Sequence, residues 1–164
     1  MTDFKALLRA LSEAGVEHIV IGGVAAAAHG SARATFDLDV VYRRSPENID
    51  RLVGALTPYH PYLRGAPPGL PFRWDAATIQ RGLNFTLTTD IGDLDVLGEI
   101  VGGGGYDALV TATEVVRAFG VECRLLNLER LIEVKRAAGR PKDFETIAEL
   151  ETIRGQRRPP PSTG

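Results

Sequence analysis

Two aspartates stand at alternate positions inside a run that otherwise has the composition of a buried strand. Residues 36–42 read Phe-Asp-Leu-Asp-Val-Val-Tyr, which sets Asp37 and Asp39 among apolar neighbours. Alternate residues of a strand share one face, so both carboxylates should project from the same side of it. Strand interiors are depleted in Asp, and breaches of local preference collect at functional sites. The pattern predicts a strand that presents two carboxylates together.

Asp37 and Asp39 are candidate ligands of a divalent cation. Two close carboxylates repel each other and resist desolvation, and a divalent cation relieves both effects. Mg²⁺ is normally held by one or two carboxylates together with substrate phosphates. The alternative is that one Asp belongs to a turn while the other simply faces solvent.

A second pair, Asp93-Leu94-Asp95, stands on another expected strand. We take Asp95 as the third site carboxylate because it is flanked by Leu94 and Val96, whereas Asp93 adjoins the expected turn at Ile91-Gly92 and has a structural role available there. Three carboxylates on neighbouring strands can hold two metal ions, one activating a nucleophilic oxygen and one neutralising the leaving phosphates. We therefore predict two Mg²⁺ ions.

The pair Gly22-Gly23 follows an expected strand over residues 18–21 and opens an alanine-rich helix. Backbone N–H groups at a helix N-terminus form a natural phosphate site, although a tight turn explains the glycines equally. Arg33 and Thr35 lie in the connection just before Asp37. They could contact a phosphate or orient the metal ligands, or they could be ordinary surface residues.

Lys135 continues an apolar stripe on the helix that Asn127 is expected to cap. The stripe consists of Leu128, Leu131 and Ile132. Lysine is almost never fully buried without a partner, which favours an ammonium that reaches a triphosphate. The alternative is a lysine that extends outward at the edge of the stripe. Arg140 and Lys142 add two cations at the start of the next helix.

This local cluster matters because the chain as a whole is close to neutral. Lys and Arg number 19 against 21 Asp and Glu, a net charge of -2, so there is no global attraction for nucleic acid.

One cysteine excludes an internal disulfide, and three scattered histidines with one cysteine make a zinc site a poor fit. No apolar stretch approaches the ~20 residues that cross a bilayer. We expect a cytoplasmic protein without membrane contact.

The 164 residues suffice for one domain. We expect it to span residues 1–156, followed by a disordered basic and proline-rich tail over 157–164. Periodicity and capping residues predict helices over 3–14, 24–29, 46–56, 128–138 and 142–153. Strands are expected over 18–21, 36–42, 84–89, 93–97, 115–119 and 122–126, with loops over 58–71 and a mobile one over 102–105. The fold class is α/β (α+β), a small mixed sheet flanked by helices.

These segments resemble a known family. Residues 19–25 and 29–40 are similar to the first motif of minimal-type bacterial nucleotidyltransferases of the DNA-polymerase-β superfamily. The closest group includes abortive-infection and toxin–antitoxin nucleotidyltransferases. Residues 131–143 resemble that group as well, and Asp95 falls where its third carboxylate strand would be. The resemblance covers roughly residues 5–150.

The resemblance implies an enzyme that moves a nucleoside monophosphate from an NTP, such as ATP, to an acceptor hydroxyl and releases pyrophosphate. Asp37 and Asp39 would bind both metals, while Asp95 would complete the nucleophile-side ion and could act as base. The phosphates would be held by Gly22 and Gly23, with Lys135 nearby. The acceptor could be RNA, including a tRNA end, a protein side chain or a small molecule. A toxin–antitoxin or stress role is implied at the level of the family.

The chain departs from the family pattern at three points. Gly23 stands where many relatives have Ser, the spacing from Gly22 to Asp37 is longer than in the shortest motifs, and the large helical C-terminal domain of many members is not in the printed sequence. A helical partner or antitoxin protein could supply the acceptor site. Two alternatives remain: a nucleotide- or partner-binding module with little catalysis, and a structural role in which the Asp pairs merely decorate strand ends.

Overall fold

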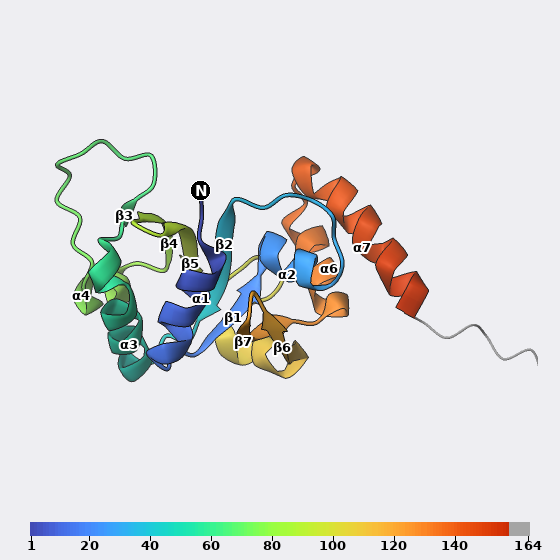
Figure 1. The fold of residues 1–164 in the computed structure, drawn as a ribbon, viewed down its shortest axis with the longest axis horizontal. Helices are drawn as coiled ribbons and strands as arrows, with labels where there is room; N and C mark the ends of the chain where they lie inside the picture. The colour runs from blue at the N-terminus through green and yellow to red at the C-terminus, as the bar shows by residue number, and fades with distance from the viewer. Residues whose placement is uncertain (158–164) are drawn as a thin grey trace, which may run out of the picture.

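The computed structural model describes residues 1–157, which form a mixed sheet with helices packed around it (Figure 1). Within these residues the sheet has seven strands in the order β3-β4-β5-β2-β1-β7-β6. The strands are β1 (His18–Ile21), β2 (Asp37–Tyr42), β3 (Tyr62–Leu63), β4 (Asn84–Thr89), β5 (Gly92–Leu97), β6 (Thr113–Ala118) and β7 (Val121–Leu126). The helices are α1 (Phe4–Glu13), α2 (Gly22–Ala28), α3 (Pro46–Leu56), α4 (Ala76–Arg81), α5 (Tyr106–Leu109), α6 (Leu128–Ala138) and α7 (Phe144–Arg157). The predicted fold class is confirmed.

The centre of the sheet combines parallel and antiparallel pairs. β2 runs parallel to β5 and antiparallel to β1, while β1 runs parallel to β7. β4–β5 and β6–β7 form two antiparallel hairpins from strands that the sequence predicts. Because β2 and β5 are neighbours, the two Asp-x-Asp segments lie side by side.

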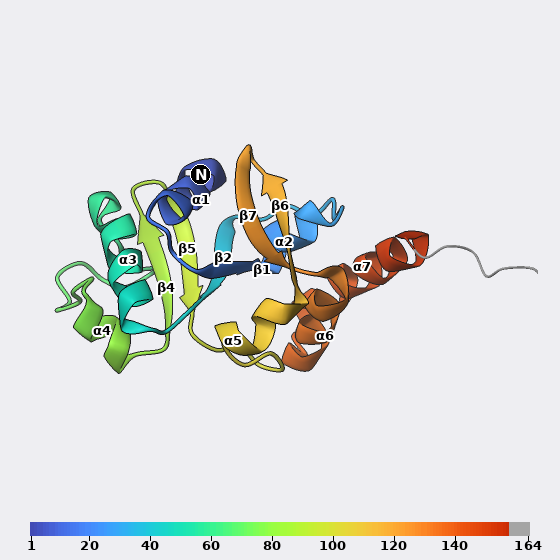
Figure 2. The same ribbon diagram turned by 90° about the horizontal axis from the view of Figure 1, so that it is seen from below.

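α3 and α4 lie at one end of the molecule and α6 and α7 at the other, as both views show (Figures 1 and 2). α3 packs against α1 and α4 at one end, and α6 packs against α2 and α7 at the other. In β2 and β5 the fully buried Leu38, Val40, Leu94 and Val96 alternate with the partly exposed aspartates. One face of this half of the sheet is therefore core, and the opposite face carries the carboxylates.

Three helices begin at a capping side chain. Asp3, Ser45 and Asn127 each accept a hydrogen bond from a backbone N–H three residues on, at the starts of α1, α3 and α6. These bonds satisfy donors that the first helical turn leaves free. Three helix boundaries differ from prediction by two or more residues. α2 already begins at Gly22, α7 begins at Phe144 because Pro141–Asp143 forms a separate 3₁₀ turn, and α7 ends at Arg157 instead of at residue 153.

Three short elements, β3, α4 and α5, were not predicted. They contain two, six and four residues, too few for a helical or alternating period to emerge. β3 also lies in the proline-rich segment 58–71, which was expected to be a loop throughout. Its pairing with β4, Leu63 opposite Leu87, is a tertiary contact that the local sequence does not encode.

The glycine run 102–105, expected to be mobile, is folded into a hydrogen-bonded turn. The backbone N–H of Ile100 donates to the Gly104 carbonyl at 2.9 Å, and Arg130 Nη2 donates to the Gly102 carbonyl at 3.0 Å. At the end of the chain, Arg157 closes α7 and donates from Nη2 to the His29 carbonyl at 2.8 Å. The rest of the predicted tail, 158–164, lies outside the described residues.

Candidate functional site

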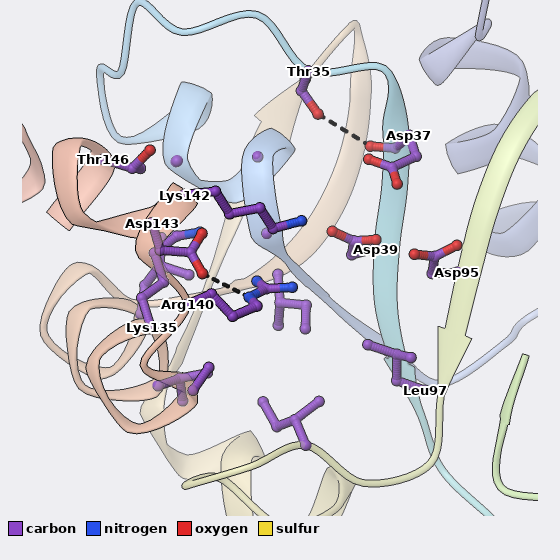
Figure 3. A pocket seen from close by; sticks show the side chains of 18 of the residues that line it. Thr35, Asp37, Asp39, Asp95, Leu97, Lys135, Arg140, Lys142, Asp143 and Thr146 are labelled. Carbon is purple, nitrogen blue, oxygen red and sulfur yellow. Dashed lines mark hydrogen bonds and ion pairs between the residues drawn. The ribbon is translucent and has the colours of Figure 1, made fainter. Parts of the chain in front are cut away.

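The register of β2 with β5 brings three carboxylates together. Asp37 is opposite Asp93, and Asp39 is opposite Asp95. Asp37, Asp39 and Asp95 each offer an oxygen that lies within 4.8 Å of the other two. The grouping predicted from two separate Asp-x-Asp segments is therefore present as a single cluster (Figure 3).

Asp39 experiences strong electrostatic conflict within this cluster. Burial, followed by the charges of Asp37 and Asp95, raises the pKa of Asp39 to about 8, and a hydrogen bond with Asp95 acts in the same direction. The positive charge of Lys135 acts against the rise. A carboxylate that is this unfavourable in its ionised form becomes stable when a cation binds beside it. The donor set, three carboxylate oxygens, suits a hard cation such as Mg²⁺.

The cluster opens into a cleft of about 890 Å³. Its walls come from β2, β5, α2, α6, the loop before β2 and the turn before α7. Every residue that the sequence singled out lines this cleft: Gly22, Gly23, Arg33, Thr35, Asp37, Asp39, Asp95, Lys135, Arg140 and Lys142. Leu97, Ile100, Val101, Leu131 and Val134 give the cleft an apolar side as well.

The two glycines allow α2 to approach the acidic cluster closely. Gly22 has φ +66°, a left-handed conformation that favours glycine, and a Cβ there would lie 2.1 Å from Asp39 Oδ2. A Cβ at Gly23 would lie 2.5 Å from Thr35 Oγ1. A side chain at either position would displace a group that lines the cleft. The glycines therefore leave room for the Asp39 and Thr35 side chains beside the start of α2.

Thr35 and Arg33 have different surroundings. The Thr35 hydroxyl donates to the Asp37 carbonyl at 3.2 Å, so it braces the start of β2 beside the cluster. Arg33 is directed toward α7, where it pairs with Glu145 at 2.9 Å and approaches Glu149 at 4.0 Å. Arg33 lines the cleft, but its charge is shared with these two carboxylates.

Two of the three cations of the opposite wall pair with Asp143. Lys135 is buried, with its Nζ 3.6 Å from Asp143 Oδ1, and Arg140 Nε donates to Asp143 Oδ2 at 2.7 Å. The alternative of an outward-extending Lys135 is thereby excluded. Lys142 has no ion pair with any other described residue, and its ammonium points toward the carboxylates in Figure 3. The sequence analysis did not identify Asp143 as a site residue, although it lies next to Lys142 in the Gly-Arg-Pro-Lys-Asp segment.

Arg64 was also missed, and it contacts the acidic cluster directly. Its Nη2 lies 2.8 Å from Asp95 Oδ1, its Nη1 3.5 Å from Asp37 Oδ2 and its Nε 3.4 Å from Asp93 Oδ2. Arg64 directly follows β3, in the segment expected to be a loop. Only the pairing of β3 with β4 carries it to β5, so no local sequence signal identifies it.

No family model matches the chain, and no curated protein matches it by sequence. Solved structures do resemble it. A candidate nucleotidyltransferase from Thermotoga maritima aligns with 89% of this chain and 88% of its own, at 15% identity and a TM-score of 0.56. The lincomycin-bound lincosamide antibiotic adenylyltransferase LnuA aligns with 93% of this chain and 98% of its own, at 14% identity and a TM-score of 0.61.

A third similar structure is an antigenic nucleotidyltransferase-like protein from Paracoccidioides brasiliensis, with 15% identity, a TM-score of 0.59, and coverage of 95% of this chain and 75% of its own. Identities this low establish the fold alone, and the chain has the nucleotidyltransferase fold.

Over residues 1–157, no helix combines the length and apolar character needed to cross a membrane.

Proposed function

We propose that the protein is a Mg²⁺-dependent nucleotidyltransferase that transfers a nucleoside monophosphate from an NTP to an acceptor hydroxyl. The observation that carries this proposal is the cluster of Asp37, Asp39 and Asp95, which faces the cationic wall of the same cleft. The similarity to nucleotidyltransferase structures supports it independently. Two ions, as expected from three carboxylates, are part of the proposal.

Each side of the cleft has a distinct role in this reaction. Asp37 and Asp39 hold the metal, while Asp95 completes the nucleophile side. A bound Mg²⁺ ion supplies Lewis-acid stabilisation of the reacting phosphate and makes the acceptor oxygen a better nucleophile. The acceptor oxygen bonds to the α-phosphorus, the bond from that phosphorus to the bridging oxygen of the β-phosphate breaks, and pyrophosphate leaves. The hydroxyl proton passes to the Asp95 carboxylate.

The phosphates lie between the cluster and the turn before α7. Lys142, whose ammonium points across the cleft, contributes positive charge to the departing pyrophosphate. Lys135 and Arg140 raise the positive potential of the wall while Asp143 fixes their positions. Gly22 and Gly23 let the backbone at the start of α2 approach the same phosphates.

The acceptor is proposed only by class. The similarity to LnuA, a lincosamide antibiotic adenylyltransferase with lincomycin bound, favours ATP as donor and a hydroxylated small molecule as acceptor. RNA or a protein side chain as acceptor, an antitoxin partner and a cytoplasmic location stay predictions of the sequence.

One observation favours the alternative of a nucleotide-binding module with little catalysis. Lys135 and Arg140 both pair with Asp143, which leaves less positive charge for a substrate.

Label transfer tests the reaction. Each α-³²P NTP is incubated with Mg²⁺ and the protein, together with total RNA, cell protein or a panel of hydroxylated small molecules. We expect label to enter one acceptor class with wild type and with Asp107→Ala, a carboxylate that pairs with Arg43 outside the cleft. Label should be absent with the Asp37→Ala/Asp39→Ala double variant. Equal transfer by the double variant would refute the proposal, and NTP binding without transfer would support the binding module.

A further inference from the structure

A single guanidinium, that of Arg64, lies among the carboxylates of both Asp-x-Asp segments. It is within 3.5 Å of Asp37, within 3.4 Å of Asp93 and within 2.8 Å of Asp95. The contact with Asp95 is also a hydrogen bond, donated by Nη2 to Oδ1. Two of these three carboxylates, Asp37 and Asp95, belong to the proposed metal site.

The fold holds Arg64 in this position from two directions. Its backbone N–H donates to the Thr86 carbonyl at 3.0 Å, and its Nη2 also donates to the Leu87 carbonyl at 2.8 Å. The side chain is 27% exposed, so solvent screens its charge only in part. Its hydrogen bonds to two carbonyls of β4 distinguish Arg64 from a freely moving surface arginine.

One donor of Arg64 remains unsatisfied. The Nε atom is buried and has no hydrogen-bond partner within the described residues, although Asp93 Oδ2 is 3.4 Å away. A buried donor without a hydrogen bond carries a desolvation cost. The guanidinium therefore lies close to the carboxylates without satisfying all of its hydrogen-bond donors.

We propose that Arg64 is the internal counter-ion of the site, which neutralises the nucleophile-side carboxylates before substrate arrives and competes there with the divalent cation. The inference rests on the proposed metal dependence of the function. Metal alone binds weakly because Arg64 already contacts Asp95 and Asp37. Metal that arrives with a nucleotide binds strongly because the phosphates add negative ligands.

Arg64 is a positioning residue in this scheme because it acts through Asp95. The Arg64 guanidinium and a divalent cation at the same carboxylates are like charges a few ångströms apart, and at a partly buried site their repulsion is only partly screened. Even after relaxation, loss of the guanidinium should strengthen metal binding to the nucleotide-free protein by about tenfold or more. The same loss should lower the rate of transfer, since Asp95 is then no longer held.

The test is Mn²⁺ binding to the nucleotide-free full chain, followed by electron paramagnetic resonance of the free ion. Arg64→Gln removes the charge and keeps a polar amide, whereas Arg64→Lys keeps the charge. The control is Arg43→Gln, because Arg43 likewise bridges two carboxylates, Glu17 and Asp107, outside the site. We expect about tenfold tighter Mn²⁺ binding for Arg64→Gln, with Arg64→Lys and Arg43→Gln close to wild type.

Unchanged or weaker Mn²⁺ binding in folded Arg64→Gln would overturn the inference. If Arg64→Gln does not fold, Arg64→Lys provides the test. The lysine ammonium is shorter and cannot span the same carboxylates, so the transfer rate of this variant must fall while its Mn²⁺ binding stays within about threefold of wild type. A wild-type transfer rate would overturn the positioning role. The proposed function fails separately. If Asp37→Ala/Asp39→Ala binds Mn²⁺ as wild type does, the metal site itself is wrong.

Discussion

Asp39 illustrates at the level of one residue why the acidic cluster is suited to a bound cation. It lies between Asp37 on its own strand and Asp95 on the neighbouring strand, and burial removes much of the water that would stabilise its charge. These effects raise its pKa to about 8, so the metal-free carboxyl is largely protonated at neutral pH. Binding of a divalent cation must therefore displace a proton.

The raised pKa of Asp39 predicts a pH-dependent metal affinity. Below pH 8 the proton competes with the ion, so the apparent Mn²⁺ affinity should rise by about tenfold per pH unit from pH 6 toward pH 8 and then level off. Calorimetry in buffers of different ionisation enthalpy should detect release of close to one proton at pH 7. An Asp39→Asn variant that kept the same steep pH dependence would assign the proton to another group.

The same shift predicts how stability depends on pH when no metal is bound. The folded pKa of about 8 is above the ordinary value of 3.8, so between these values the folded state binds the proton that the unfolded state has lost. The free energy of unfolding should therefore fall as pH rises from about 4 through 8. Asp39→Asn should flatten this part of the profile, measured by urea unfolding at a series of pH values.

Gly22 offers a second prediction at the residue scale. Gly22→Ala forces a side chain into a left-handed conformation and places its Cβ 2.1 Å from Asp39 Oδ2. We expect a loss of about 1–3 kcal/mol in the free energy of unfolding, and loss of Mn²⁺ binding because Asp39 must move. Gly54→Ala is the matched control, since nothing lies within 4 Å of a Cβ there and the residue is in the interior of α3. Intact Mn²⁺ binding in Gly22→Ala would contradict this account.

The elements that place the site differ in how far the sequence predicts them. β1, β2, β4 and β5 have apolar or alternating runs bounded by turn residues, and the main helices have capping residues, so local rules suffice. The parallel pairing of β2 with β5 sets which aspartates face one another, and it depends on contacts distant in the chain. β3 contains only two residues and gives no period at all. For that reason the three aspartates were predicted, whereas Arg64 was not.

A buried asparagine joins the elements behind the site. Asn48 on α3 is fully buried, accepts from the Glu17 N–H at 2.7 Å, and donates to the carbonyls of Glu17 at 3.0 Å and Arg43 at 2.8 Å. It therefore ties α3 to the start of β1 and to the end of β2. The alternating strand pattern gives no indication of this role.

Asn48→Ala should be destabilising because it leaves buried backbone groups without partners. We expect the free energy of unfolding to fall by about 1–3 kcal/mol, measured by chemical denaturation. Gln80→Ala, at an exposed position of α4, is the control and should change it by less than about 0.5 kcal/mol. A loss for Asn48→Ala as small as that of the control would show that other groups or water replace its hydrogen bonds.

The whole molecule concentrates opposite charges in one cleft while remaining close to neutral. Its net charge is -2, yet the acidic cluster of β2 and β5 faces Lys135, Arg140 and Lys142 across the cleft. One wall belongs to the sheet and the other to the α6–α7 end of the molecule. A ligand that bridges the two walls should therefore stabilise the whole folded chain. We propose residues 1–156 as the catalytic domain; α7, which ends at Arg157, forms part of its second wall.

Binding of Mg²⁺ with an NTP should therefore raise the melting temperature of the whole chain. At a ligand concentration about 100 times the Kd, mass action contributes about 2.7 kcal/mol to stability. Asp39→Ala should abolish this increase while leaving the ligand-free protein as stable as wild type or more so, because it removes a buried carboxyl whose ionised form the cluster disfavours. Asp107→Ala should keep the full increase. Melting curves with and without Mg²⁺–NTP measure both effects, and a full ligand-induced increase in Asp39→Ala would place nucleotide and metal elsewhere than in this cleft.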